Sequence, residues 1–407
     1  MPHIPKEICA YCKGVKRLCG EKICPILVKQ SHLIEGLPRI MKREFQGITP
    51  PNIFVGEYNY PVVNFGPLST YQYSVPIDDP EIWAKKRLDI IEILKIRLGL
   101  VYSYSKKKVR EAVSLSDELK EAIISLRPVD LDVVLKKEPR VVVRLDADIP
   151  PMGASGQLEK VDVVGNPLTS RKIESVLYED AKAAILAREL YNYGLNFYYI
   201  QRLLSAGLLG TIARRRFVPT RWSITATDAI LGKYFLDRIK YYQPLGAPRL
   251  HYHEYLGNKY YLLLIPSNFW AMEMFEIWLP FSVWVRHGNP VVINIHEDYD
   301  GKPNKYDGGY FAIRYGVLEY LKNIKRKAAV LAIRIITPRY IAPVGSWQIR
   351  ESVRIALSKP PILVGEEEKL FQHVMDKEYD NIRLNIKKRS WLLKRLKTPT
   401  LAQFLKI

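Results

Sequence analysis

The N-terminus limits the fold of this chain more than any other segment does, because every cysteine lies there. The 407-residue chain has four cysteines at C-x2-C-x6-C-x4-C spacing, which are Cys9, Cys12, Cys19 and Cys24. A disulfide framework would distribute its cysteines through the fold, whereas four thiolates at short spacing are typical of one tetrahedral zinc site. Four cysteine ligands leave no coordination position open for water. We therefore predict a structural zinc ion that holds a small N-terminal knuckle.

The chain carries a large excess of positive charge. It has 62 Lys and Arg residues against 42 Asp and Glu residues, which gives a formal net charge of +20. A surplus of this size favours a polyanionic partner, and nucleic acid is the first candidate. The sequence has no run of about 18 apolar residues, and its N-terminus lacks the apolar core of a signal peptide. We therefore expect a soluble, cytoplasmic protein without a membrane partner.

Helical and strand patterns are interleaved along the chain. Short apolar runs predict strands over 52–55, 62–65, 140–145, 260–265, 291–295 and 328–336, and the run at 140–145 is rich in β-branched residues. Apolar residues at three- and four-residue spacing predict helices over 79–104, 114–126, 170–194, 198–204, 225–242, 310–322 and 381–397. Lysines 106–108 are assigned to a solvated helix end. Because no regular βαβ repeat is present, the expected fold is mixed α/β of the α+β type, with a basic C-terminal helix and a short tail.

A basic turn followed by a helix is predicted within residues 208–228, LLGTIARRRFVPTRWSITATD. Pro219 interrupts a regular helix, and Thr225 and Asp228 have the spacing of an N-terminal capping box. A helix N-terminus flanked by guanidinium groups suits an anion. The predicted backbone-phosphate contacts, with an indole packing or stacking beside them, are Arg214, Arg215, Arg216 and Arg221, and Trp222. The alternative is a solvated basic edge with Trp222 in the core.

Two carboxylates follow the predicted strand 140–145. Asp146 and Asp148 stand one residue apart, which is a common arrangement for holding a divalent cation, although such residues more often cap a turn. Together with Asp228 they are the weak candidates for catalytic metal ligands. Aromatic residues are dense over 269–284, where stacking on unpaired bases is one interpretation and a buried core is the favoured one.

Several motifs resemble one known family. VPTRWSITATDA at 218–229 closely resembles a signature of the archaeal Nre family of DNA-repair proteins, and the FVG–YP–GPL pattern within 51–68 and the GSWQIRE block at 345–351 resemble it in the same order. The resemblance implies a role in DNA-damage repair together with the sliding clamp, PCNA, and it assigns no reaction. It implies a zinc knuckle over 1–30, an Nre N-terminal-type α/β domain over 31–295, an Nre C-terminal-type domain over 296–397, and a clamp-binding tail over 398–407.

The tail, TPTLAQFLKI, resembles the clamp-binding pattern Q-x-x-[LIM]-x-x-[FY]-[FY]. Leu401 takes the aliphatic place and Phe404 the first aromatic place, so both side chains lie on one face of a helical turn. Thr398 stands where glutamine is usual and Leu405 where a second aromatic residue is usual, and both departures are expected to reduce affinity. The alternative is a C-terminal segment that folds back on its own protein.

Three functions stay open at this point. The first is a DNA-damage repair protein that binds DNA through basic surfaces and is recruited to the clamp by its tail. The second is a metal-dependent nuclease or another hydrolase that processes nucleic acids. The third is an RNA-binding or RNA-processing protein. Whether the protein is an enzyme is not decided by the sequence.

Overall fold

The structure, a computed structural model, describes residues 8–14, 16–21, 24–30, 42–49, 52–70, 78–165, 167–285, 287–378, 386 and 389–397. It confirms the mixed α/β class, with two mixed sheets. The chain divides into two compact units, which do not follow the predicted segments 31–295 and 296–397. Unit 1 comprises residues 1–22, 232–341 and 348–407, and unit 2 comprises residues 23–231 and 342–347.

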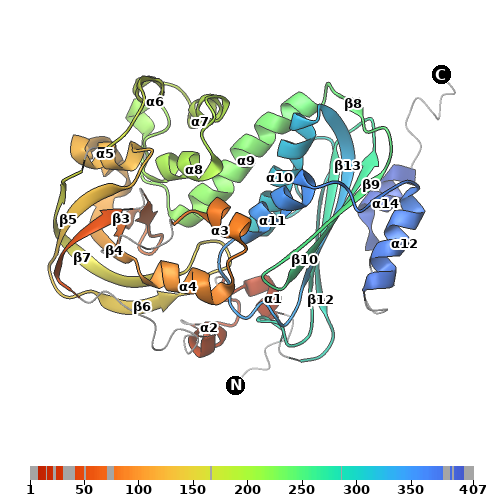
Figure 1. The fold of residues 1–407 in the computed structure, drawn as a ribbon, viewed down its shortest axis with the longest axis horizontal. Coiled ribbons are helices and arrows are strands. Elements are labelled where there is room, and N and C mark those ends of the chain that lie inside the picture. Colours follow the sequence, from red (N-terminus) through yellow and green to blue (C-terminus); the bar gives the residue numbers. More distant parts are fainter. Residues whose placement is uncertain are drawn as a thin grey trace. The chain divides into compact units, whose positions relative to one another are not determined.

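Unit 2 contains a seven-stranded sheet (Figure 1). Its strands are β1 (Glu44–Thr49), β2 (Ile53–Val55), β3 (Val62–Ser69), β4 (Val101–Lys108), β5 (Val129–Leu135), β6 (Arg140–Arg144) and β7 (Met152–Val163). Their order is β1-β5-β7-β4-β3-β2, with β6 also paired to β7. The β4–β7 pair is parallel and the other pairs are antiparallel.

The helices of unit 2 are short, and two of the predicted ones are divided. They are α2 (Pro25–Gln30), α3 (Pro80–Lys86), α4 (Ile90–Leu98), α5 (Asp117–Ile124), α6 (Arg171–Tyr178), α7 (Ala183–Asn192) and α8 (Phe197–Ser205), with 3-10 turns η2 (Val109–Ser114) and η3 (Ile212–Arg214). The predicted helix 79–104 is wrong as a single element. It ends at Arg87, which has a φ of 56°, restarts after the capping box of Asp89, and gives way to strand β4.

The predicted helix 170–194 is also two helices. Helix α6 ends at Glu179, whose backbone is extended, and α7 begins at Ala183. Between them, the Asp180 carboxylate accepts a 2.6 Å hydrogen bond from the backbone N–H of Ile212. This hydrogen bond connects the segment between α6 and α7 to the loop that carries the three consecutive arginines.

Unit 1 contains the second seven-stranded sheet. Its strands are β8 (Gln243–Pro244), β9 (Arg249–Tyr255), β10 (Asn258–Pro266), β11 (Ala271–Trp278), β12 (Val291–Glu297), β13 (Arg326–Ile336) and β14 (Leu363–Val364). The order is β12-β11-β13-β10-β9-β14, with β8 beside β13. The central β11–β13 pair is parallel, and each of the two strands is buried along nearly its whole length.

Helices cover both faces of this sheet (Figure 1). One face carries Phe275, Leu263 and Leu331 and packs against α12 (Glu367–Lys377) and α14 (Trp391–Lys397). Helix α10 (Gly308–Asn323) packs against β13. Helix α11 (Trp347–Ser358) opens the last chain segment of unit 1, which begins at Gln348. The aromatic-rich stretch 269–284 supplies core, as favoured, because its three tryptophans are buried; Phe281 is an exception, being 69% exposed.

The predicted helix 381–397 is interrupted at Ser390. Of its described residues, Ile386 and Arg389 are helical, and the regular helix α14 starts after the interruption, at Trp391. The Ser390 hydroxyl accepts from the N–H of Leu393 at 3.1 Å, and the buried Glu273 carboxylate accepts from the N–H groups of Trp391 and Leu392 at 2.9 and 3.1 Å. Ser390 and Glu273 therefore cap the helix, and α14 ends at Lys397.

Candidate nucleic-acid interface

Helix α9 (Thr220–Ile239) starts in unit 2 and continues from Gly232 in unit 1. The predicted capping box of Thr225 and Asp228 is wrong, because the helix begins five positions earlier. The N–H groups of Trp222 and Ser223 donate to the Pro219 carbonyl at 2.8 and 2.9 Å, so Pro219 starts the helix where we expected it to interrupt one. A proline suits this position, since the first helical N–H groups have no intrahelical acceptor.

The hydroxyl groups of this motif are used inside the fold. Thr220 Oγ1 accepts from the backbone N–H of Val55 at 2.9 Å. Ser223 and Thr227 are fully buried, and their hydroxyls donate to the carbonyls of Thr220 and Ser223 at 2.9 and 2.8 Å. These three residues fix the start of α9 against strand β2 and use their hydroxyls inside the fold.

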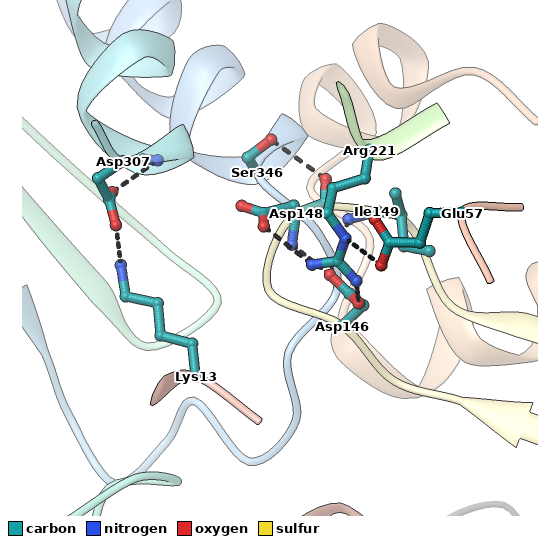
Figure 2. Close-up of polar contacts among 9 residues, drawn as sticks. Lys13, Glu57, Asp146, Asp148, Ile149, Arg221, Asp307 and Ser346 are labelled. Atoms are coloured by element: carbon teal, nitrogen blue, oxygen red, sulfur yellow. Dashed lines mark hydrogen bonds and ion pairs between the residues drawn. The ribbon is translucent and has the colours of Figure 1, made fainter. Parts of the chain in front are cut away.

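Arg221 is surrounded by three carboxylates of unit 2 (Figure 2). Its Nη2 pairs with Asp146, its Nη1 lies 3.1 Å from Asp148 Oδ2, and its Nε lies 3.1 Å from Glu57 Oε1. Burial alone would lower the pKa of Arg221, but the three carboxylates outweigh burial and raise it. Its guanidinium nitrogens are therefore committed to protein carboxylates, so the structure gives it a bracing role where we predicted a phosphate contact.

The same contacts bear on the predicted acidic metal site. Asp146 Oδ1 caps a turn by accepting from the N–H groups of Asp148 and Ile149 at 2.8 and 3.3 Å. The guanidinium of Arg221 lies at the point where Asp146 and Asp148 converge. Asp228 is buried on α9. In the described ranges, no three His, Cys, Asp or Glu side chains gather closely enough to hold a metal ion. The turn-cap alternative therefore accounts for Asp146.

The three consecutive arginines separate into two roles. Arg215 is half-buried, and it donates from Nε to the Gly210 carbonyl at 3.0 Å and from Nη2 to the Leu177 carbonyl at 2.5 Å. Burial lowers the pKa of Arg215. Arg215 therefore holds its own loop together, whereas Arg214 and Arg216 are exposed to solvent.

Three further cations, which sequence reasoning missed, join Arg214 and Arg216. Five exposed side chains form what we call the basic surface: Lys106, Lys108, Arg110, Arg214 and Arg216. The N–H of Phe217 donates to the Val109 carbonyl at 2.8 Å, and η2 packs against η3, which brings the two chain segments together. Within the described part of the chain, none of the five takes part in an ion pair. The alternation of tyrosine and serine over 102–105 was the missed signal of a strand.

Aromatic side chains border the basic surface. The set that we call the aromatic ledge is Tyr58, Tyr60 and Trp222, which are 70%, 41% and 45% exposed. The rings of Tyr60 and Trp222 lie 5.0 Å apart between centroids at an angle of 48°. The ledge follows the basic surface closely, because the N–H of Val109 donates to the Pro61 carbonyl at 3.0 Å and Lys108 pairs with Val62. Trp222 is therefore exposed beside cations. It does not lie in the core, which was the alternative interpretation of the sequence.

The cysteine segment folds into tight turns. Helix α1 (Ile8–Cys12) is followed by Lys13 and Gly14 at φ 50° and 76°, and Gly20 has a φ of 80°, so the backbone turns sharply after Cys12 and after Cys19. Such turns fit a zinc knuckle. None of these four cysteines forms a disulfide, and the described residues do not place three His, Cys, Asp or Glu side chains closely enough to hold a metal ion. Zinc binding therefore stays a prediction.

Lys13 ties this segment to unit 1 (Figure 2). Its Nζ lies 2.8 Å from Glu276 Oε1 and 3.0 Å from Asp307 Oδ2, and all three side chains are largely buried. Burial would lower the pKa of Lys13, but Asp307 and Glu276 raise it above its usual range. Arg334 also pairs with Glu276 at 2.7 Å, so Lys13 belongs to a buried polar network of unit 1.

Two other predictions concern the tail and membranes. The proposed clamp-binding residues, Thr398, Leu401, Phe404 and Leu405, lie outside the described residues. In the part of the chain that is described, no helix combines the length and the apolar character needed to cross a bilayer.

Comparison with known proteins gives consistent matches along the chain. The model "Archaeal Nre, N-terminal" matches residues 18–285, and "Archaeal Nre, C-terminal" matches residues 297–404. The chain is 37% identical over 356 residues to "DNA repair protein NreA" of Archaeoglobus fulgidus, which covers 87% of this chain and 89% of the relative. It is 31% identical to "DNA repair protein NreB" of the same organism, over 85% and 87% of the two chains.

A third relative comes from another archaeon. "DNA repair protein NreA" of Haloferax volcanii is 33% identical over 331 residues, which covers 76% of this chain and 77% of the relative. No solved structure was found to match the chain. Residues 286–296 separate the two family matches.

Proposed function

Because the chain belongs to the archaeal Nre family, we propose that it is a DNA-repair protein that binds DNA through the basic surface and is recruited to the sliding clamp by its C-terminal tail. Its relatives carry the name of DNA-repair proteins. The observation that carries the DNA-binding part is the group of five exposed cations without ion-pair partners in the described chain. A cluster of exposed cations whose charge is not offset by ion pairs creates a local positive potential, which favours an external polyanion.

The proposed mode of binding depends on phosphates more than on sequence. Lys and Arg side chains that contact backbone phosphates release condensed counterions, which makes the affinity fall as salt rises. The basic surface has no helix arranged to enter a major groove, since its members come from a strand end, two 3-10 turns and the irregular segment after the second turn. We therefore propose binding that is strong at low salt and largely independent of base sequence.

The first prediction tests the basic surface. We expect the triple variant Lys106→Gln, Lys108→Gln, Arg214→Gln to bind DNA more weakly for every sequence, because three phosphate contacts are lost. The slope of log K against log salt should flatten by roughly 2 to 3, since each contact contributes about 0.7 to 0.9. Fluorescence anisotropy with labelled DNA at a series of salt concentrations measures both quantities.

A charge-matched control separates this surface from net charge. The variant Lys107→Gln, Lys160→Gln, Lys233→Gln also removes three positive charges. These three lysines, however, form ion pairs with Glu111, Asp162 and Asp237. This variant should keep most of the salt slope. An equal loss of slope in both triple variants would contradict the basic surface, and an unchanged slope in both would contradict DNA binding through any of these residues.

The second prediction concerns the tail, whose pattern supports clamp recruitment. We expect the Leu401→Ala, Phe404→Ala variant and the deletion of residues 398–407 to lose clamp binding, because the aliphatic and aromatic side chains that contact the clamp would be absent. The control Gln403→Ala lies inside the tail but outside those two positions, and should bind normally. Titration calorimetry with the purified clamp measures the effect. Clamp binding by the deleted protein would place the contact elsewhere, and a loss of thermal stability would make the tail structural.

We also propose that Cys9, Cys12, Cys19 and Cys24 hold one structural zinc ion. The spacing of the four thiols and the tight turns beside Cys12 and Cys19 support this assignment. When bound, the metal would crosslink a segment that is too short to build its own core.

A further inference from the structure

We propose that the aromatic ledge makes this surface selective for unpaired nucleobases, so that single-stranded DNA is its preferred ligand. The inference rests on the proposed DNA binding and adds the strand state that is bound. Its elements are an exposed aromatic pair, two lysines on the same face of one strand, and an ion-pair brace that fixes the pair in place.

Trp222 of the ledge is more exposed than the other tryptophans of this protein. The chain has seven tryptophans, all within the described residues, and the other six are buried or half-buried. Trp222 is 45% exposed although it stands between Arg221 and the buried Ser223 at the start of a well-packed helix. Exposing an indole forgoes hydrophobic stabilisation, which a ligand that covers the ring would restore.

The ring geometry suits a planar ligand. Tyr60 and Trp222 contact each other at a tilt of 48°, so each ring keeps an accessible surface, and Tyr58 stands two residues before Tyr60. Bases stack on such rings whatever their sequence, because every base has a π-face. In a duplex the base faces are covered by neighbouring pairs, so an aromatic ledge can reach them only where strands are separated.

The ledge and the lysines lie on one side of the unit 2 sheet. Tyr102, Lys106 and Lys108 alternate along β4 and therefore share a face. Tyr102 belongs to the same packed cluster as Ile224, which follows Trp222 by two residues on α9. The start of α9 thus covers the face to which Lys106 and Lys108 belong, and the two lysines are spaced about 6.6 Å apart along the strand. This spacing is comparable to the distance between successive phosphates of an extended strand.

An ion-pair brace holds the ledge before any ligand arrives. Arg221 joins Glu57, at the start of the turn that carries Tyr58 and Tyr60, to α9. The turn is closed by the N–H of Tyr60 donating to the Glu57 carbonyl at 3.3 Å and by that of Val62 donating to the Asn59 carbonyl at 2.9 Å. A ledge fixed in this way loses little conformational entropy when a base stacks on it.

Charge selects the class of partner. An apolar protein surface could also cover three exposed rings, but it would place five unpaired cations at its edge. A nucleic-acid strand supplies base faces for the rings and phosphates for the cations in one molecule, as in other single-strand binding surfaces. The observations therefore favour a single strand over a protein partner.

The test compares strand states in the full-length protein. The variant Tyr60→Leu, Trp222→Leu keeps apolar bulk but removes both π-faces, and Tyr60→Phe, Trp222→Phe keeps the π-faces. Anisotropy titrations would use a mixed-sequence single-stranded DNA, the blunt duplex of the same sequence, and the matching single-stranded RNA. We expect the unaltered protein to prefer single-stranded DNA over duplex by at least tenfold.

The leucine variant should lose about 5- to 150-fold in single-strand affinity, which is the loss of stacking on one base, while its duplex affinity and salt slope stay unchanged. The phenylalanine variant should keep most of the single-strand preference. Equal binding of both strand states, or an unaffected leucine variant, would overturn the ledge while DNA binding through the basic surface still stands. Failure of the unaltered protein to bind any DNA would instead remove the proposed function, and tighter binding of RNA would assign the surface to RNA.

Discussion

Replacing Cys9 and Cys12 by serine is expected to abolish zinc binding by a protein that otherwise holds one zinc ion per chain. The effect should be large, because structural zinc binds small peptides with apparent free energies of about 10 to 16 kcal/mol near neutral pH. The N-terminal segment should then unfold. Metal analysis of the purified protein gives the stoichiometry, and amide hydrogen exchange over residues 8–21 reports the unfolding.

The structure adds a consequence for unit 1. When the segment unfolds, Glu276 and Asp307 lose the buried ammonium of Lys13. Arg334 still pairs with Glu276, so unit 1 should stay folded with a lower thermal midpoint. The control Lys13→Met keeps all four thiols and should retain zinc while showing the same loss of stability. A native protein that contains disulfides and no zinc would refute the metal assignment.

Replacing Glu297 by leucine is expected to reduce the free energy of unfolding by about 3 to 5 kcal/mol, because it leaves a buried guanidinium without its counter-charge. Glu297 and Arg314 are almost fully buried, and Arg314 Nε lies 2.7 and 2.9 Å from the two carboxylate oxygens. The carboxylate also accepts from the indole N–H of Trp270. Guanidinium chloride unfolding, followed by circular dichroism, measures the change.

Two variants make this result interpretable. The double variant Glu297→Leu, Arg314→Met removes both charges and should recover part of the loss, with Trp270 still lacking an acceptor. The exposed pair Lys233–Asp237 is the control, since Asp237→Ala should change stability by less than about 1 kcal/mol. A Glu297→Leu protein as stable as the Asp237→Ala protein would show that the buried pair contributes little.

Local pattern was sufficient where the physical cause was local. The six predicted strands were short apolar runs and are all present. Ser116, which precedes an apolar stripe, caps α5 by accepting from the N–H of Leu119. Strand β7 was missed because its first half is built of small residues. A Cβ at Gly153 would come within 3.0 Å of the Leu98 Cα, and one at Gly156 within 2.7 Å of the Leu135 side chain.

The candidate site needed information that no local pattern contains. The sequence places Arg221 beside Trp222 in a basic stretch, but its partners Glu57 and Asp146 are 164 and 75 residues away. Only the folded sheet brings them together. The same holds for Lys106 and Lys108, which reach the arginine loop because Val109 bonds to Phe217. Sequence reasoning named the region 208–228 but could not separate the arginines that brace the fold from those that are exposed.

Unit 1 is built from three separate chain segments, so its parts are synthesised at different times. Residues 23–231, which form nearly all of unit 2, leave the ribosome as one block and can fold before the rest exists. Lys13 is made early but must wait for Asp307, 294 residues later, which corresponds to about 15 to 60 s of translation at 5 to 20 residues per second. During that interval the four thiols lie on an N-terminal segment that is not yet packed against the rest of unit 1. Zinc binding by that segment would protect the thiols from oxidation before the rest of unit 1 has been synthesised.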